Sequence, residues 1–228
     1  MGRFRERCLV GEHDRRSPAA MLRAMSDIAG EQLGDERPDW SGATVWLTGL
    51  PASGKTTTGD AVSELLRADG YVPYRLDGDV LRRGLSSDLG FDPVSRHENI
   101  RRTAHAACML AETGVVVIAS LISPYASDRA LARMIHTDAG IDFIEVFMKT
   151  PLTECERRDP RGLYARARSG EVHGLTGVDD PYEVPNDPDV VLETLEISVA
   201  EAAAAVMEAL RERGLERARR WRVADPAA

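Results

Sequence analysis

The feature that most constrains this chain is the stretch GLPASGKT, residues 49–56, which joins an apolar run to a helix-periodic run. It matches the pattern G-x-x-x-x-G-K-[ST], whose glycines let the backbone curl until successive N–H groups face phosphate oxygens. The helix that follows adds the partial positive charge of its N-terminus. The stretch therefore predicts a phosphate-binding loop between a buried strand and a helix. A glycine-rich turn without a ligand is the alternative.

Lysine usage supports the first interpretation. The chain has 29 Lys and Arg residues, yet Lys55 and Lys149 are its only lysines. A compact ammonium fits inside a loop wrapped round a phosphate, whereas a planar guanidinium is wider. In this pattern the lysine reaches the β- and γ-phosphates of a nucleotide, and the hydroxyl of Thr56 holds Mg²⁺.

The spacing of apolar residues alternates between two periods from residue 43 onward. Strands are expected at 43–49, 71–77, 115–120 and 141–150, and helices at 55–70, 95–114, 126–140 and 199–214. This alternation predicts an α/β fold with three layers, α/β/α, around a parallel sheet, of the P-loop nucleoside-triphosphate hydrolase type. Residues 154–188 are rich in Arg, Gly and Pro with weak periodicity, and we expect them to form a lid.

Composition limits the partners and the location. The net charge of −8 argues against a nucleic-acid or anionic-membrane partner. The longest apolar stretch, at 114–122, is too short to span a bilayer, and three scattered cysteines indicate a reducing compartment, so a cytoplasmic protein is expected. Residues 1–40 are interpreted as an N-terminal extension of helix and linker, without recognisable chemistry, before a main domain at 41–228.

Acidic and basic residues follow the second expected strand. Asp77 and Asp79 stand at its carboxyl end, where ligands gather in parallel sheets, and an acid there can order Mg²⁺ waters or accept a hydroxyl proton. For Asp77, a helix N-cap is an equal alternative. Arg82 and Arg96 suit phosphate or sulfate oxygens, with a solvated charged face as the alternative. Phe91 in a polar loop suits a planar ligand, unless it fills the core.

Four motifs resemble the adenylylsulfate (APS) kinase family: LDGDVLRRGLSSDLGF, SRHENIRR, SLISPY and the stretch 155–185 that begins CERRDPRGLY. They stand in the family's order and cover about residues 43–213. The resemblance implies a P-loop kinase that uses ATP and Mg²⁺ to phosphorylate the 3′-hydroxyl of APS, giving PAPS and ADP. It also implies ATP and APS as small-molecule substrates and a homodimer, which is usual in the family.

The resemblance carries site residues with it. It implies Lys55, Asp79 and Ser123 as catalytic residues, and Thr56 and Asp79 as the metal site. The ATP-binding residues implied are Gly49, Leu50, Pro51, Ala52, Ser53, Gly54, Lys55, Thr56, Thr57 and Arg158. The acceptor-binding residues implied are Asp79, Arg82, Phe91, Arg96, Asn99, Ile122, Ser123, Arg161 and Leu175. Some family members carry a phosphoserine at the position of Ser123, but in-line transfer needs no covalent step, so we interpret Ser123 as lining the site.

Four positions depart from the family pattern. Val80 replaces an asparagine, Arg83 a histidine, Arg161 a lysine and Leu175 a phenylalanine that stacks on the acceptor adenine. A missing ring removes about 1–3 kcal/mol of stacking. Two alternatives therefore stay open: a kinase of the same fold with a different nucleotide-like acceptor, and a nucleotide-binding regulatory protein without turnover.

Overall fold

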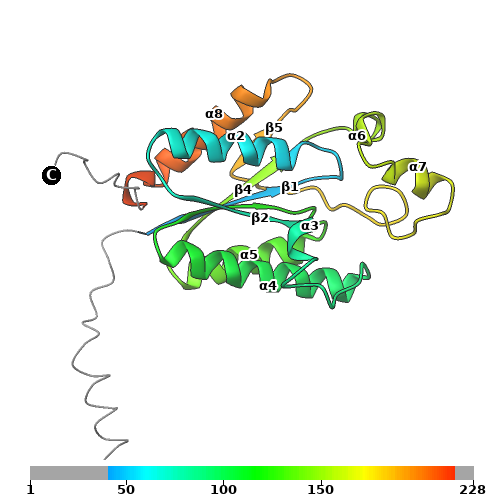
Figure 1. Cartoon of the computed structure of the whole chain (residues 1–228), viewed down its shortest axis with the longest axis horizontal. Helices are drawn as coiled ribbons and strands as arrows, with labels where there is room; N and C mark the ends of the chain where they lie inside the picture. Colours follow the sequence, from blue (N-terminus) through cyan, green and yellow to red (C-terminus); the bar gives the residue numbers. More distant parts are fainter. Residues whose placement is uncertain (1–40, 219–228) are drawn as a thin grey trace, which may run out of the picture. The chain divides into compact units, whose positions relative to one another are not determined.

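Five short strands form one parallel sheet in the computed structural model of the chain, which describes residues 41–218. The strands are β1 (Ala43–Thr48), β2 (Pro73–Asp77), β3 (Val116–Ser120), β4 (Asp142–Met148) and β5 (Val190–Leu192). Their order across the sheet is β2-β3-β1-β4-β5 (Figure 1). β1 is central and buried at every residue, as the apolar sequence ATVWLT predicts for a strand covered on both faces.

Helices cover the two faces of the sheet. α2 (Lys55–Ala68) and α8 (Val199–Glu212) pack on one face, and α4 (Pro93–Glu112) and α5 (Ala126–Asp138) pack on the other (Figure 1). Successive residues of β1 serve opposite faces: Val45 joins the α2–α8 core, whereas Trp46 joins the α4–α5 core. The predicted α/β/α fold with a parallel sheet is confirmed.

Four short elements complete the described part of the chain. α3 (Gly78–Leu81) follows β2, and the 3₁₀ helix η1 (Leu215–Arg217) follows α8. α6 (Leu152–Arg158) and α7 (Leu163–Arg168) lie within or beside residues 154–188, called the lid segment below. Both extend beyond the end of the sheet at which β1 and β4 terminate (Figure 1). The helix and linker expected in residues 1–40 lie outside the described residues.

Several boundaries differ from the expected ones, for identifiable reasons. β2 begins at Pro73, not at residue 71, and it is an edge strand, where a residue without an N–H is tolerated. α4 begins at Pro93 because the Asp92 side chain accepts a hydrogen bond from the Ser95 N–H and caps the helix. The strand β5 was not expected, since three residues are too few to show a period.

A buried histidine joins the sheet to α5. His136 is fully buried; its Nδ1 lies 2.8 Å from the Ala132 carbonyl oxygen and its Nε2 lies 2.9 Å from Thr44 Oγ1. A carbonyl only accepts, so Nδ1 carries the proton and Nε2 accepts from the Thr44 hydroxyl. Burial lowers the pKa of His136, with a small opposing effect from the Ala132 hydrogen bond.

The lowered pKa of His136 predicts that the folded state loses stability in mild acid. Because the folded pKa lies below the ordinary value of 6.5, the unfolded chain binds more protons as the pH falls through that value. We expect the free energy of unfolding in urea to decrease below that pH, by at most about 1.4 kcal/mol per pH unit from this group. His136→Gln should flatten the decrease. The exposed His173→Gln should retain it, and equal slopes in both variants would contradict the assignment.

Candidate active site

The loop between β1 and α2 has the curled backbone that the GLPASGKT motif predicts. Gly54 has φ +99° and Ala52 has φ +59°, both in the left-handed region. Gly49 lies so close to β4 that a Cβ there would stand 3.0 Å from the Met148 carbonyl oxygen. Thr56 and Thr57 occupy the first turn of α2, whose early N–H groups point out of the helix at the same place.

Lys55 is buried inside this loop. Its Nζ donates to the carbonyl oxygens of Gly49 at 2.8 Å and Leu50 at 2.6 Å, and to Ser53 Oγ at 3.2 Å. Burial lowers the pKa of Lys55 to about 8, although Cys155, Asp77 and Asp79 act in the opposite direction. The ammonium is thus held by neutral oxygens of the loop itself.

Asp77 connects the loop to the end of β2. Its Oδ2 accepts a hydrogen bond from Thr56 Oγ1 at 3.0 Å, and its Oδ1 accepts from the Asp79 N–H at 2.9 Å. The N-cap interpretation of Asp77 is confirmed, since the carboxylate caps α3. Its role at a metal or a hydroxyl proton stays a prediction, although the carboxylate also contacts the expected metal ligand Thr56. The metal site predicted from the sequence included Thr56 and Asp79 and left Asp77 out.

Asp79 faces the lid segment. Its carboxylate forms an ion pair with Arg161, and both side chains are more than half exposed. An exposed ion pair contributes little to stability and is easily exchanged for other partners. Arg161 therefore reaches the expected catalytic carboxylate from the opposite side of the site.

The oxygen donors at this edge fit Mg²⁺. Among residues 41–218, no group of three or more His, Cys, Asp or Glu side chains could hold a metal ion. Mg²⁺ does not need such a group, because it keeps several waters and is usually bound by one or two carboxylates together with substrate phosphates. The Thr56 hydroxyl and the carboxylates of Asp77 and Asp79 provide this kind of donor set.

Arg82 and Phe91 lie together beyond α3. The Arg82 guanidinium stands 4.3 Å from the centroid of the Phe91 ring and donates to the Gly90 carbonyl oxygen at 2.7 Å. Burial, and then the nearby Arg96, lower the pKa of Arg82. The Phe91 ring is 63% exposed, so it does not fill the core and one of its faces remains available to a planar ligand.

Arg96 joins the Phe91 loop to the lid segment. Its guanidinium donates to the carbonyl oxygens of Phe91 at 2.7 Å and Gly174 at 2.5 Å, and to Thr176 Oγ1 at 3.0 Å. Asn99 lies one turn further along α4, and its buried Oδ1 has no hydrogen-bond partner among the described residues. An unpartnered buried polar atom usually indicates a place for water or ligand.

The loop after β3 supplies Ile122 and Ser123. Thr48 Oγ1 donates to the Ile122 carbonyl oxygen at 2.8 Å. Ser123 is buried with φ +39°, and its Oγ accepts a hydrogen bond from the Trp46 indole N–H at 3.1 Å. Ser123 therefore has a strained backbone and a hydroxyl held by Trp46, and its place in the lining of the site stays a prediction.

Two of the expected site residues in the lid segment, Arg158 and Leu175, have different surroundings. A Cβ added to Gly54 would stand 3.8 Å from an Arg158 guanidinium nitrogen, so Arg158 lies over the phosphate loop. Leu175 is only 8% exposed and belongs to a small apolar cluster with Cys155 and Tyr164. Leu50 and Ala52 of the loop pack against the same cluster.

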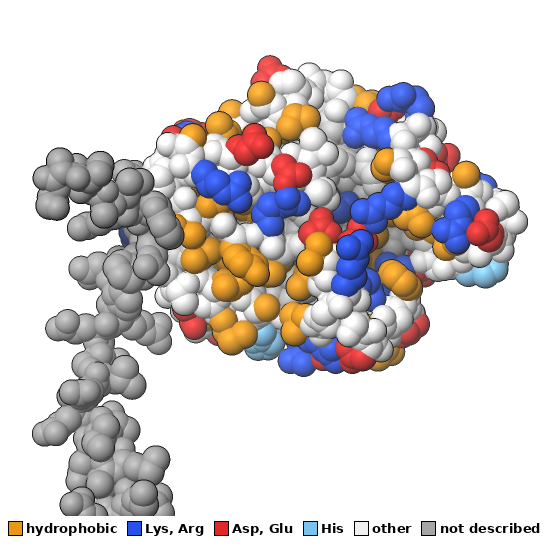
Figure 2. All heavy atoms as spheres, viewed as in Figure 1, with side chains coloured by type: hydrophobic (Ala, Val, Ile, Leu, Met, Phe, Trp, Pro, Cys, Tyr) orange, Lys and Arg blue, Asp and Glu red, His pale blue; other side chains and the backbone are white. Residues whose placement is uncertain are grey.

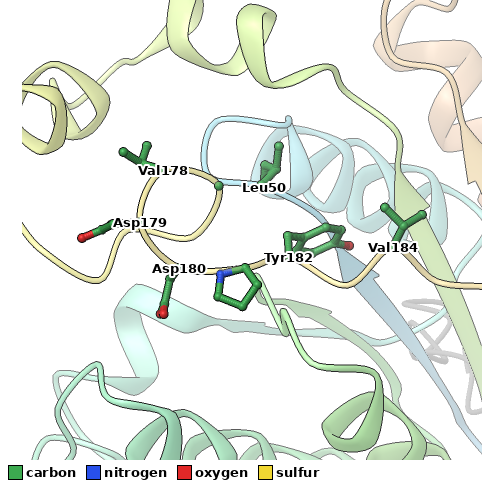
Figure 3. A pocket seen from close by; sticks show the side chains of 8 residues that line it. Leu50, Val178, Asp179, Asp180, Tyr182 and Val184 are labelled. Atoms are coloured by element: carbon green, nitrogen blue, oxygen red, sulfur yellow. The ribbon is translucent and has the colours of Figure 1, made fainter.

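A cavity opens between the loop and the end of the lid segment. Its volume is about 550 Å³, and it is lined by Leu50, Gly177, Val178, Asp179, Asp180, Pro181, Tyr182 and Val184 (Figure 3). Basic and acidic side chains gather along the hollow that separates the lid segment from the main body (Figure 2). The charged side chains that line the cavity itself are the carboxylates of Asp179 and Asp180, beside the apolar side chains of Leu50, Val178 and Val184.

A sequence model of adenylylsulphate kinase matches residues 41–193, which is more than half of the chain. The chain belongs to the adenylylsulphate kinase family. The adenylyl-sulfate kinase of Saccharomyces cerevisiae is 46% identical over 169 residues, which cover 74% of this chain and 84% of that protein.

Among the helices of residues 41–218, none combines the length and the apolar character that a membrane crossing requires.

Other relatives are longer or structurally characterised. The bifunctional enzyme CysN/CysC of Mycobacterium tuberculosis is 52% identical over 169 residues, but this chain spans only 27% of its length. A solved structure of the M. tuberculosis APS kinase CysC in complex with AMPPNP and APS has a TM-score of 0.74 and 51% identity, covering 75% of this chain and 98% of that one.

The structure brings together two groups of the site residues that the sequence predicts. One group is Lys55, Asp79 and Arg161, which lie near Thr56. The other is Arg82, Phe91 and Arg96, which lie together beyond α3. The bond between Thr56 and Asp77 was missed, although the position of an acid at a strand end was a signal for it.

The two roles of Asp77 can be separated by substitution. Asp77→Ala removes both the α3 cap and the acceptor of the Thr56 hydroxyl, so we expect the free energy of unfolding to fall by about 1–2 kcal/mol. Asp77→Asn keeps a capping oxygen and should recover most of that loss in urea titrations. If Asn were as damaging as Ala, the negative charge and not the hydrogen bonds would stabilise this edge.

Proposed function

We propose that this chain is an ATP-dependent kinase that phosphorylates the 3′-hydroxyl of APS, giving PAPS and ADP in sulfate assimilation. The observation that carries the proposal is the contact between Thr56 of the phosphate loop and Asp77, two residues before Asp79. It supports the proposal because it joins the loop expected to bind the triphosphate to the strand end that carries the carboxylate expected to serve the acceptor hydroxyl. Membership of the adenylylsulphate kinase family and the AMPPNP- and APS-bound relative support the two substrates.

The donor site consists of residues 49–57 with Arg158 above them. Lys55 would exchange the carbonyl oxygens of Gly49 and Leu50 for phosphate oxygens, and its charge would offset the charge that develops on the transferring group. Mg²⁺, when bound, would supply positive charge that offsets part of the phosphate charge. Thr56, Asp77 and Asp79 would hold it directly or through water.

The acceptor site consists of residues on both sides of Asp79. Asp79 would orient the 3′-hydroxyl and accept its proton, after Arg161 gives up the ion pair with this carboxylate. Phe91 would stack on the adenine, and Arg82, Arg96 and Asn99 would hold the phosphosulfate. Ile122 and Ser123 would line the wall next to the loop, and residues 154–188 would close over both nucleotides and exclude water.

The second candidate function is a kinase with a different acceptor, because Val80 and Leu175 depart from the family pattern at the expected acceptor site. Val80 is 63% exposed beside Asp79 and carries no hydrogen-bonding group. Leu175 is buried in the cluster next to Tyr164, where it offers no ring to an adenine. These two features favour weaker APS binding or a different nucleotide-like acceptor of the same transfer reaction.

We also propose a homodimer, as is usual in the family. A similar structure, 25% identical with a TM-score of 0.58, is a hexameric APS kinase from Thiobacillus denitrificans, so self-association occurs among the relatives.

The decisive experiment supplies the purified chain with ATP, Mg²⁺ and a panel of nucleotide acceptors. We expect ADP release and a 3′-phosphorylated product from APS, because the acceptor residues named above suit a phosphosulfate. Lys55→Ala should reduce turnover by about 100-fold or more, whereas Lys149→Ala, the other lysine of the chain, should retain it. Product only from another nucleotide would establish the second candidate, and no product from any acceptor would overturn the kinase proposal.

The lowered pKa of Lys55 predicts that the protein takes up a proton when a nucleotide binds. Its pKa of about 8 lies below the ordinary 10.5, and nearby phosphate charges raise it again. Binding of ADP should therefore take up about 0.9 proton at pH 9 and about 0.1 at pH 7, and affinity should fall as the pH rises above 8. Calorimetry in two buffers of different ionisation enthalpy measures the uptake. It should vanish in Lys55→Ala and persist in Lys149→Ala.

A further inference from the structure

Two hydroxyl groups outside the GLPASGKT motif hold the phosphate loop from behind. The phenol of Tyr164 in α7 donates to the Pro51 carbonyl oxygen at 3.0 Å. The hydroxyl of Thr150, which follows β4, donates to the Ser53 carbonyl oxygen at 3.0 Å. Tyr164 is 2% exposed and Thr150 is 7% exposed, so water does not compete freely for either carbonyl.

These contacts set the direction of two N–H groups. In a planar trans peptide, the carbonyl and the N–H of the next residue point in opposite directions. A Pro51 carbonyl held toward the lid segment therefore turns the Ala52 N–H inward, and a Ser53 carbonyl held toward Thr150 does the same for Gly54. Within residues 41–218, neither N–H has a protein acceptor, which is the state expected of groups reserved for an anion.

The loop needs such support because its backbone is not relaxed. Ala52 has φ +59°, a left-handed conformation that an alanine rarely adopts without help from its surroundings. The Tyr164 ring is fixed in the apolar cluster that Leu50 and Ala52 also contact, so its phenol has little freedom. Thr150 Oγ1 also lies 2.5 Å from Thr194 Oγ1, which must be the donor of that pair, since the Thr150 proton is given to Ser53.

We propose that Tyr164 and Thr150 are positioning residues that orient the Ala52 and Gly54 N–H groups toward the phosphates of the nucleotide. Neither side chain touches the reacting atoms. Tyr164 also makes the loop geometry depend on the lid segment, because α7 carries the phenol. The inference rests on the proposed function, since it assumes that the loop binds a nucleotide.

The test measures ADP affinity of the full chain by calorimetry, first in the wild type. Tyr164→Phe keeps the ring and removes the phenol, and Thr150→Val keeps the shape and removes the hydroxyl. Each should raise the ADP dissociation constant about 3- to 10-fold, the effect of one lost hydrogen bond in the right place. The KM for ATP should rise in parallel, while the KM for APS stays unchanged, which a general loss of structure would not produce.

Two matched controls keep the result interpretable. Thr150→Ser retains the hydroxyl and should bind ADP within about twofold of the wild type. Thr194→Val removes the hydroxyl that donates to Thr150 and leaves the loop untouched. This variant should also bind ADP within about twofold of the wild type. Thermal midpoints show that each variant is folded.

The outcomes distinguish the inference from the function on which it rests. If folded Tyr164→Phe or Thr150→Val bound ADP as tightly as the wild type does, the proposed role of that side chain would be overturned. An equal loss in Thr194→Val and Thr150→Val would show that the effect is one of packing and would overturn the role of Thr150. A wild-type chain that binds no ADP would overturn the proposed function itself.

Discussion

The site depends on a backbone that presents N–H groups to an anion while its carbonyl oxygens are bonded on the outside. Such a curl is unfavourable for a free peptide, because it uses left-handed conformations and leaves donors unpaired. In this chain the Lys55 ammonium bonds two carbonyls from within, and Thr150 and Tyr164 bond two others from behind. The central position of β1, with β4 beside it, brings Thr150 to the back of the loop.

Donor and acceptor sites are linked by arginines that contact both the sheet edge and the lid segment. Arg96 bonds the Phe91 loop and residues 174–176, and Arg161 pairs with Asp79. In the proposed function, a phosphosulfate or a phosphate would take these same guanidinium donors. Substrate binding would then compete with contacts inside the protein.

The sequence predicted the layers, the parallel sheet and the loop because each rests on a local pattern. It could not predict β5, because three residues show no period, or the bond between Thr56 and Asp77, because two side chains 21 residues apart meet only when the fold brings them together. The roles expected for Arg158 and Leu175 also depend on tertiary contacts. Arg158 lies over Gly54, while Leu175, the replacement for an aromatic residue, packs into a small core with Cys155 and Tyr164.

The order of residues by itself determined the phosphate loop, the choice of lysine at position 55 and the family, since these follow from short motifs with fixed spacing. Only the tertiary structure decided which side chains surround the loop. Thr150 and Tyr164 lie 97 and 113 residues from the carbonyls that they bond. No local pattern encodes such a pairing, because a hydrogen bond depends on distance and direction in space, which the packing of β4 and the lid segment against β1 supplies.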